Sequence, residues 1–154
     1  MIQKMQNVML HNKVKILYIE DDPINMILVK KLLMREGFQV LEAVNGWAGI
    51  AMTQAHKPDL ILMDMNMPDL DGYLATERLK NMPGLKHIPI VALTANAMDG
   101  DRQRSLDSGC AGHITKPINI NTFAEEVREH FKHLTNESAI DIAERAVPYS
   151  LMNK

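Results

Sequence analysis

Acidic, hydroxyl and ammonium side chains recur in this sequence at the ends of short apolar runs. The five that could act together are Glu20, Asp21, Asp64, Thr94 and Lys116. Carboxylates held about 4 Å apart repel by roughly 4 kcal/mol per pair at an effective dielectric constant of about 20. One lysine cannot neutralise three carboxylates, so the group requires either a protonated carboxyl or a hard divalent cation. Mg²⁺ fits best, because it binds a few carboxylates, keeps water ligands and accepts a phosphoryl oxygen.

A phosphoryl group would use every member of this set. Its transfer needs a nucleophile, an in-line approach and neutralisation of the equatorial oxygens. Asp64 would be the nucleophile and would form an acyl phosphate. Mg²⁺, the Lys116 ammonium and the Thr94 hydroxyl would each bind one phosphoryl oxygen. The prediction depends on the conjunction, because Thr94 alone is typical of a strand and Lys116 alone is typical of a charged surface.

Two other kinds of site share part of this pattern. A calcium loop also begins Asp-x-Asn, but it needs Gly at its sixth position and Glu at its twelfth, where this sequence has Asp69 and Ala75. An aspartate-nucleophile phosphohydrolase places a second Asp two residues after the first as its general acid and base. Asn66 stands there and cannot exchange a proton. The sequence therefore disfavours both alternatives.

The elements that must position these side chains alternate between short apolar runs and amphipathic segments. The runs predict buried strands at 14–19, 38–43, 59–64, 88–94 and 111–115. The segments between and after them predict helices at 23–36, 47–56, 72–81, 99–108 and 121–134. This alternation indicates an α/β fold, with a parallel sheet covered by helices on both faces. Such sheets bind ligands beyond the carboxyl ends of their strands, which is where the five side chains are expected.

Turn and cap residues mark the ends of the predicted elements. Asp22 stands before Pro23, where a helix cap is more typical than a metal ligand. Gly37 follows the predicted first helix, at the place where a C-terminal cap is expected. The predicted domain covers 14–134. We expect a flexible segment at 1–13 and, at 135–154, a tail that forms at most a short helix.

Composition and charge narrow the classes of partner. The chain has 154 residues, 46% of them hydrophobic, and its 17 basic and 19 acidic residues nearly cancel. This balance favours neither nucleic acid nor an anionic membrane. No apolar run approaches the roughly 20 residues that span a bilayer. The single Cys110 cannot form an intramolecular disulfide, which fits a reducing compartment. We therefore expect a cytoplasmic domain without nucleic-acid or membrane partners.

The sequence also resembles a known family, the receiver domain of two-component response regulators with its CheY-like fold. The resemblance covers most of the chain and is carried by segments 15–22, 59–64, 67–72, 89–95 and 116–117. The spacings of thirty residues from Asp64 to Thr94 and twenty-two from Thr94 to Lys116 match the family pattern. The resemblance implies a doubly wound, flavodoxin-like (βα)5 fold with strand order 2-1-3-4-5.

The same resemblance implies a set of metal ligands. Glu20 and Asp21 would be the acidic pair that binds Mg²⁺, with Mn²⁺ as an alternative ion. Asp64 would be both the phosphoacceptor and a ligand. The backbone carbonyl of Asn66 would be the remaining metal ligand supplied by the protein.

The resemblance also implies a switch. Thr94 would close on the phosphoryl group, and Lys116 would pair with it next to a cis bond to Pro117. The family's switch aromatic on the fifth strand, usually Tyr or Phe, is His113 here. Imidazole packs less apolar area and titrates near neutrality, so we hypothesise that switching depends on pH.

In function, the chain is most similar to a stand-alone, single-domain response regulator. Phosphate would come from a histidine kinase or a histidine phosphotransfer protein, and a downstream protein effector would bind the altered face of a monomer or weak dimer. The only activities expected are self-phosphorylation and self-dephosphorylation, without enzymatic turnover. Two alternatives remain open: a receiver module of a hybrid histidine kinase phosphorelay, and a phosphate-independent interaction module.

Overall fold

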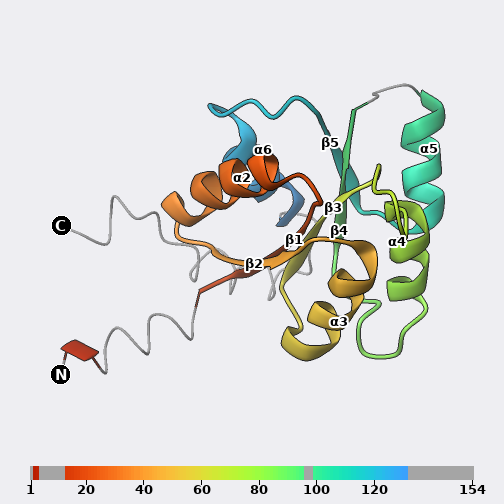
Figure 1. Ribbon diagram of the computed structural model, residues 1–154, viewed down its shortest axis with the longest axis horizontal. Coiled ribbons are helices and arrows are strands. Elements are labelled where there is room, and N and C mark those ends of the chain that lie inside the picture. The colour runs from red at the N-terminus through yellow and green to blue at the C-terminus, as the bar shows by residue number, and fades with distance from the viewer. Residues whose placement is uncertain (1, 4–12, 96–98, 132–154) are drawn as a thin grey trace.

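The computed structural model describes residues 2–3, 13–95 and 99–131 (Figure 1). The predicted tail at 135–154, nearly all of the predicted N-terminal segment and the last three residues of the predicted final helix lie outside these ranges. None of the helices in the described ranges combines the length and the apolar character that crossing a membrane requires.

Five parallel strands form one sheet in the order β2-β1-β3-β4-β5 (Figure 1). They are β1 (Lys15–Ile19), β2 (Gln39–Ala43), β3 (Leu60–Asp64), β4 (Ile90–Thr94) and β5 (Gly112–Thr115). The expected order 2-1-3-4-5 is therefore confirmed. The predicted strands began one or two residues too early, because apolar character reports burial rather than ladder pairing. Val14, Phe38 and Ile88, for example, are buried but precede their strands.

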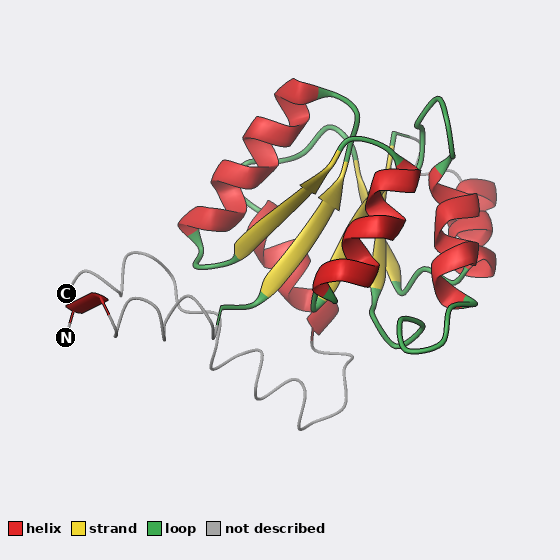
Figure 2. Ribbon diagram, turned by 60° about the horizontal axis from the view of Figure 1, so that its bottom comes forward, coloured by secondary structure: helices red, strands yellow, loops and turns green. Residues whose placement is uncertain are grey.

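Helices cover both faces of the sheet, as Figure 2 shows. They are α2 (Pro23–Arg35), α3 (Gly46–His56), α4 (Gly72–Lys80), α5 (Asp99–Ser108) and α6 (Phe123–Phe131). Side chains alternate along β1: Ile16 and Tyr18 join the core under α2 and α6, whereas Leu17 and Ile19 join the core under α3 and α4. Two cores on opposite faces of one parallel sheet confirm the doubly wound fold.

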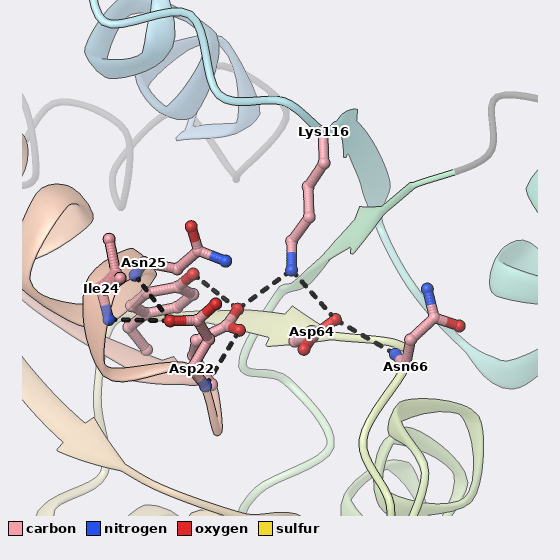
Figure 3. Close-up of polar contacts among 8 residues, drawn as sticks. Asp22, Ile24, Asn25, Asp64, Asn66 and Lys116 are labelled. Atoms are coloured by element: carbon pink, nitrogen blue, oxygen red, sulfur yellow. Dashed lines mark hydrogen bonds and ion pairs between the residues drawn. The ribbon is translucent and has the colours of Figure 1, made fainter.

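Side-chain caps start α2, α3 and α4, each of which follows a strand. Asp22 accepts a hydrogen bond from the Ile24 N–H at 2.8 Å, so its predicted role as a cap is confirmed (Figure 3). Asn45 and Asp71 cap α3 and α4 in the same way. After α2, Gly37 adopts a φ of 92°, a left-handed conformation that costs glycine little. The three N-terminal caps start helices at the edge where the strands end, and the Gly37 turn leads the chain into β2 at the opposite edge of the sheet.

Gly72 begins α4 where the chain passes close to the end of β3. A Cβ here would lie 2.6 Å from the Asp64 carbonyl oxygen and 2.7 Å from the Met65 Cα, both of them backbone atoms. We expect Gly72→Ala to lower the free energy of unfolding by about 2–3 kcal/mol, because the backbone beside Asp64 must move. Urea unfolding measures this change.

Gly100 provides the matched control for that prediction. It lies in α5, and a Cβ added there meets nothing within 4 Å. Gly100→Ala should leave stability unchanged or raise it by up to about 1 kcal/mol, through helix propensity alone. Equal losses in the two variants would contradict the steric argument.

Candidate functional site

Three carboxylates meet beyond the ends of β1 and β3. One oxygen from each of Glu20, Asp21 and Asp64 lies within 4.8 Å of the other two. Glu20 and Asp64 are buried, with 2% and 3% of their surface exposed, whereas Asp21 is exposed to solvent. No other group of three His, Cys, Asp or Glu side chains in the described ranges is spaced to hold a metal ion. This oxygen-only set, open to water on the side of Asp21, suits Mg²⁺, which keeps several water ligands.

The Lys116 ammonium lies between two of these carboxylates. Its Nζ is 3.1 Å from Glu20 Oε2 and 3.3 Å from Asp64 Oδ1 (Figure 3). Burial alone would lower the pKa of this ammonium, but the Asp64 and Glu20 carboxylates outweigh burial and the pKa is raised. Lys116 is therefore charged at neutral pH. A single positive charge leaves the cluster net negative, which favours a bound cation.

Asp64 ends β3 and is held by one of its two oxygens. Oδ1 accepts the Asn66 N–H at 3.1 Å and also faces Lys116 (Figure 3). Within the described ranges no donor reaches Oδ2. Burial raises the pKa of Asp64 above its ordinary value of 3.8, and the Asn66 and Lys116 bonds offset this only partly. The carboxylate is thus oriented through Oδ1, while Oδ2 is available as a nucleophile.

The Thr94 hydroxyl is buried and has no hydrogen-bond partner among the described residues. Thr94 ends β4 one residue beyond Leu93, which is the register partner of Asp64. A buried polar group without a partner costs about 1–3 kcal/mol. An acceptor oxygen of a group bound next to Asp64 would satisfy this hydroxyl. The site therefore offers a hydrogen-bond donor for an anionic ligand in addition to carboxylates for a metal ion.

The remaining predicted residues lie around this cluster. The Lys116–Pro117 peptide bond is cis, as expected. Asn66 is exposed and lies two residues beyond Asp64, to which it donates its backbone N–H. Among the described residues, no hydrogen bond or ion pair joins His113 to the cluster. It lies on β5, half-buried, and its Nε2 accepts a hydrogen bond from Arg102 Nε at 3.0 Å.

Tyr18 was not anticipated as a site residue. Its hydroxyl donates to Glu20 Oε2 at 2.8 Å. The signal was present in the spacing, because residues two apart on a strand point to the same side. The apolar run around Tyr18 led us to treat the residue as core only.

His113 yields a prediction on pH dependence. The Arg102 bond requires an unprotonated Nε2, and burial together with the Arg102 charge lowers the pKa of His113 below its ordinary value of 6.5. The folded chain therefore binds fewer protons here than the unfolded chain as the pH falls below 6.5. This contribution to stability is present above that pH and is lost as the pH falls toward the lower, folded-state pKa.

Urea unfolding at about pH 8 and about pH 5.5 measures this contribution. Wild type should lose more stability between these conditions than His113→Tyr, which cannot gain a proton. His113 also lines a pocket with Glu126, Glu129 and His130 of α6. These side chains are present in both proteins, so the comparison isolates the change at position 113. Identical pH profiles for wild type and variant would contradict the prediction.

Comparisons with known proteins agree with this geometry. A family model described as the response regulator receiver domain matches residues 16–128. The polar-differentiation response regulator DivK of Brucella anthropi is 36% identical over 115 residues, which cover 75% of this chain and 94% of DivK.

Solved structures show the same likeness. Chemotaxis protein CheY4 of Vibrio cholerae superimposes with a TM-score of 0.73 at 26% identity, covering 76% of this chain and 98% of CheY4. The receiver domain of the sensor histidine kinase PA1611 from Pseudomonas aeruginosa gives a TM-score of 0.70 at 32% identity, covering 76% of this chain and 96% of that domain. That structure contains a magnesium ion coordinated in its active-site cleft.

Proposed function

Because this chain belongs to the response regulator receiver domain family, we propose that it accepts a phosphoryl group on Asp64 and thereby switches a protein–protein interaction in two-component signalling. One observation carries the proposal: the Asp64 carboxylate, the Lys116 ammonium and the Thr94 hydroxyl lie at the carboxyl edge of the sheet, and this hydroxyl has no hydrogen-bond partner among the described residues. This set supplies a nucleophile, a cation and a hydroxyl donor.

Glu20, Asp21 and Asp64 would hold Mg²⁺, with the backbone carbonyl of Asn66 as a further ligand. When bound, the ion would neutralise the crowded carboxylates and polarise a phosphoryl oxygen. The spacing of the three acids within 4.8 Å supports this assignment, as does the magnesium ion in the PA1611 receiver. Mn²⁺ accepts the same oxygen ligands and should substitute for Mg²⁺.

Asp64 would act as the nucleophile in a transfer between two side chains. A carboxylate oxygen of Asp64 bonds to phosphorus, while the bond from phosphorus to the donor's imidazole nitrogen breaks. The electron pair of the broken bond stays on that nitrogen. Lys116 would bind one oxygen of the transferred group, and the Thr94 hydroxyl would donate to another. The chain is a signalling module that reacts once per phosphorylation, not an enzyme that turns over a separate substrate.

The partners follow from this chemistry. The phosphoryl donor would be a histidine kinase or a histidine phosphotransfer protein, and the chain would act in the cytoplasm on a protein effector. Thr94 and His113 lie on neighbouring strands, since Ala92 on β4 pairs with His113 on β5. A Thr94 that moves onto the phosphoryl group would therefore change the packing around His113 at the edge of the sheet.

A second candidate is a receiver module within a hybrid histidine kinase. The 32% identity to the receiver of the sensor kinase PA1611 favours it. The chemistry at Asp64 would be the same, but phosphate would pass on to another histidine instead of switching an effector. The length of the protein made from the native gene distinguishes the two.

Incubation with Mg²⁺ and acetyl phosphate tests the proposal. Intact-protein mass spectrometry should show one added phosphoryl group, and hydroxylamine should remove it, as expected for an acyl phosphate. EDTA should prevent the addition. An unchanged mass in the presence of Mg²⁺ and donor would contradict the proposed function.

A further inference from the structure

We propose that Tyr18 is a positioning residue for the metal site: its hydroxyl holds the Glu20 carboxylate in the orientation that binds the divalent cation. The inference rests on the proposed function, because it assumes that Glu20 is a ligand. It assigns a role to a side chain that lies in the core and is not one of the three proposed carboxylate ligands.

Tyr18 is completely buried on β1, with none of its surface exposed. Its ring belongs to the core cluster under α2 and α6. A tyrosine hydroxyl in such surroundings needs an acceptor, and Glu20 Oε2 provides one at 2.8 Å. Glu20 follows the last residue of β1 and lies two residues after Tyr18, so the extended backbone directs the phenol and the carboxylate to the same side.

Glu20 depends on this hydrogen bond because its other donors are weaker or shared. The Asp22 N–H reaches Oε1 at 3.3 Å, a long contact for a hydrogen bond. The Lys116 ammonium reaches Oε2 at 3.1 Å but also lies 3.3 Å from Asp64. Tyr18 is the short donor that contacts no second acid within the described ranges.

The arrangement also selects which oxygen of Glu20 is available. Oε2 accepts from Tyr18 and Lys116, whereas the one donor to Oε1 among the described residues is the long Asp22 contact. A glutamate has one more rotatable bond than an aspartate, so an unrestrained Glu20 would lose more conformational freedom on binding a cation. When Lys116 binds a phosphoryl oxygen, as the proposed function requires, Tyr18 remains as the donor to Oε2.

The Mg²⁺ affinity of the unphosphorylated protein tests the inference. Isothermal titration calorimetry should show that Tyr18→Phe binds Mg²⁺ about tenfold more weakly than wild type, as expected when a hydrogen-bond partner of a ligand is removed. At saturating Mg²⁺, acetyl phosphate should label the variant to the wild-type extent. A thermal melt without Mg²⁺ verifies that the variant is folded.

Tyr73 offers a matched control. It is also a buried tyrosine, on α4, and its hydroxyl makes no hydrogen bond within the described ranges. The Arg104 guanidinium instead stacks over its ring, with the guanidinium carbon 3.8 Å from the ring centroid. Tyr73→Phe should therefore bind Mg²⁺ with wild-type affinity.

A double-mutant cycle with Glu20→Asp separates positioning from general damage to the core. The aspartate is shorter by one methylene and should not reach the Tyr18 hydroxyl. In that background, adding Tyr18→Phe should change the Mg²⁺ affinity by less than about twofold.

Two results would overturn the inference. One is a Tyr18→Phe protein whose Mg²⁺ affinity lies within about twofold of wild type. The other is an equal loss of affinity when Tyr18→Phe is introduced with and without Glu20→Asp, because the hydroxyl would then act elsewhere. A wild-type protein that bound no Mg²⁺ would instead overturn the proposed function, and this inference with it.

Discussion

Replacing Asp64 by Asn is expected to abolish acyl-phosphate formation from a phosphodonor and Mg²⁺. The amide has nearly the shape of the carboxylate but carries no charge, so it offers neither an anionic nucleophile nor a strong metal ligand. Asp64→Ala removes the oxygens altogether and should give the same result. Mass spectrometry after incubation with acetyl phosphate should show no adduct above background for either variant.

Loss of labelling in these variants should not reflect unfolding. Asp64 lies buried beside Glu20, and burial already raises its pKa, so a neutral amide removes repulsion and should preserve or increase stability. Asp69→Asn is the matched control, because Asp69 is an exposed acid in the loop that follows β3. Acetyl phosphate should label Asp69→Asn to the same extent as wild type. Undiminished labelling of Asp64→Asn would refute the assignment of the phosphoacceptor.

Lys116→Met is expected to lower the free energy of unfolding by about 3 kcal/mol in the absence of divalent ions. The ammonium lies 3.1 Å from Glu20 and 3.3 Å from Asp64, and the side chains of those two acids are only 1% and 4% exposed. Removing one partner of a buried ion pair leaves an uncompensated charge, which typically costs about 3–5 kcal/mol. We expect a loss near the lower end of this range because Lys116 is partly exposed. Urea unfolding in EDTA measures the loss.

Added Mg²⁺ should then stabilise Lys116→Met more than it stabilises wild type. In the variant the ion would supply the only positive charge among the three carboxylates, so the folded state would bind it more tightly, and tighter binding to the folded state raises stability. Lys80→Met is the control. Lys80 is also a half-buried lysine, but it donates to the carbonyls of Lys86 and Ile88 away from the acids. Equal stabilisation of all three proteins by Mg²⁺ would contradict the argument.

The fold could be predicted from local patterns because each element leaves its own signal in the sequence. Runs such as 59–64 are apolar throughout, as strands buried on both faces require. Caps such as Asp22 mark helix starts by a side-chain bond to residues only two or three positions away. The strand bounds were less accurate, since Phe38 and Ile88 are buried beside the sheet without belonging to a strand.

The convergence of the site residues was also predictable, from the topology that the elements imply. Parallel strands end at one edge of the sheet, so the acids at the ends of β1 and β3 must approach Thr94 at the end of β4 and Lys116 just after β5. The Tyr18 bond to Glu20 was not predicted. Spacing places the two side chains on one side of β1, but only rotamers and distances decide whether a hydroxyl meets a carboxylate.

Residue identity and order were thus sufficient to place the acids, the threonine and the lysine at the ends of strands, because hydrophobic periodicity is a property of short segments. The folded chain alone decides that Lys116 bridges Glu20 and Asp64 and that the Thr94 hydroxyl lacks a partner within the described ranges. Lys116 and Glu20 are 96 positions apart. The distance between their side chains depends on how every intervening strand and helix packs. No local pattern in the sequence fixes such a distance to within a few tenths of an ångström.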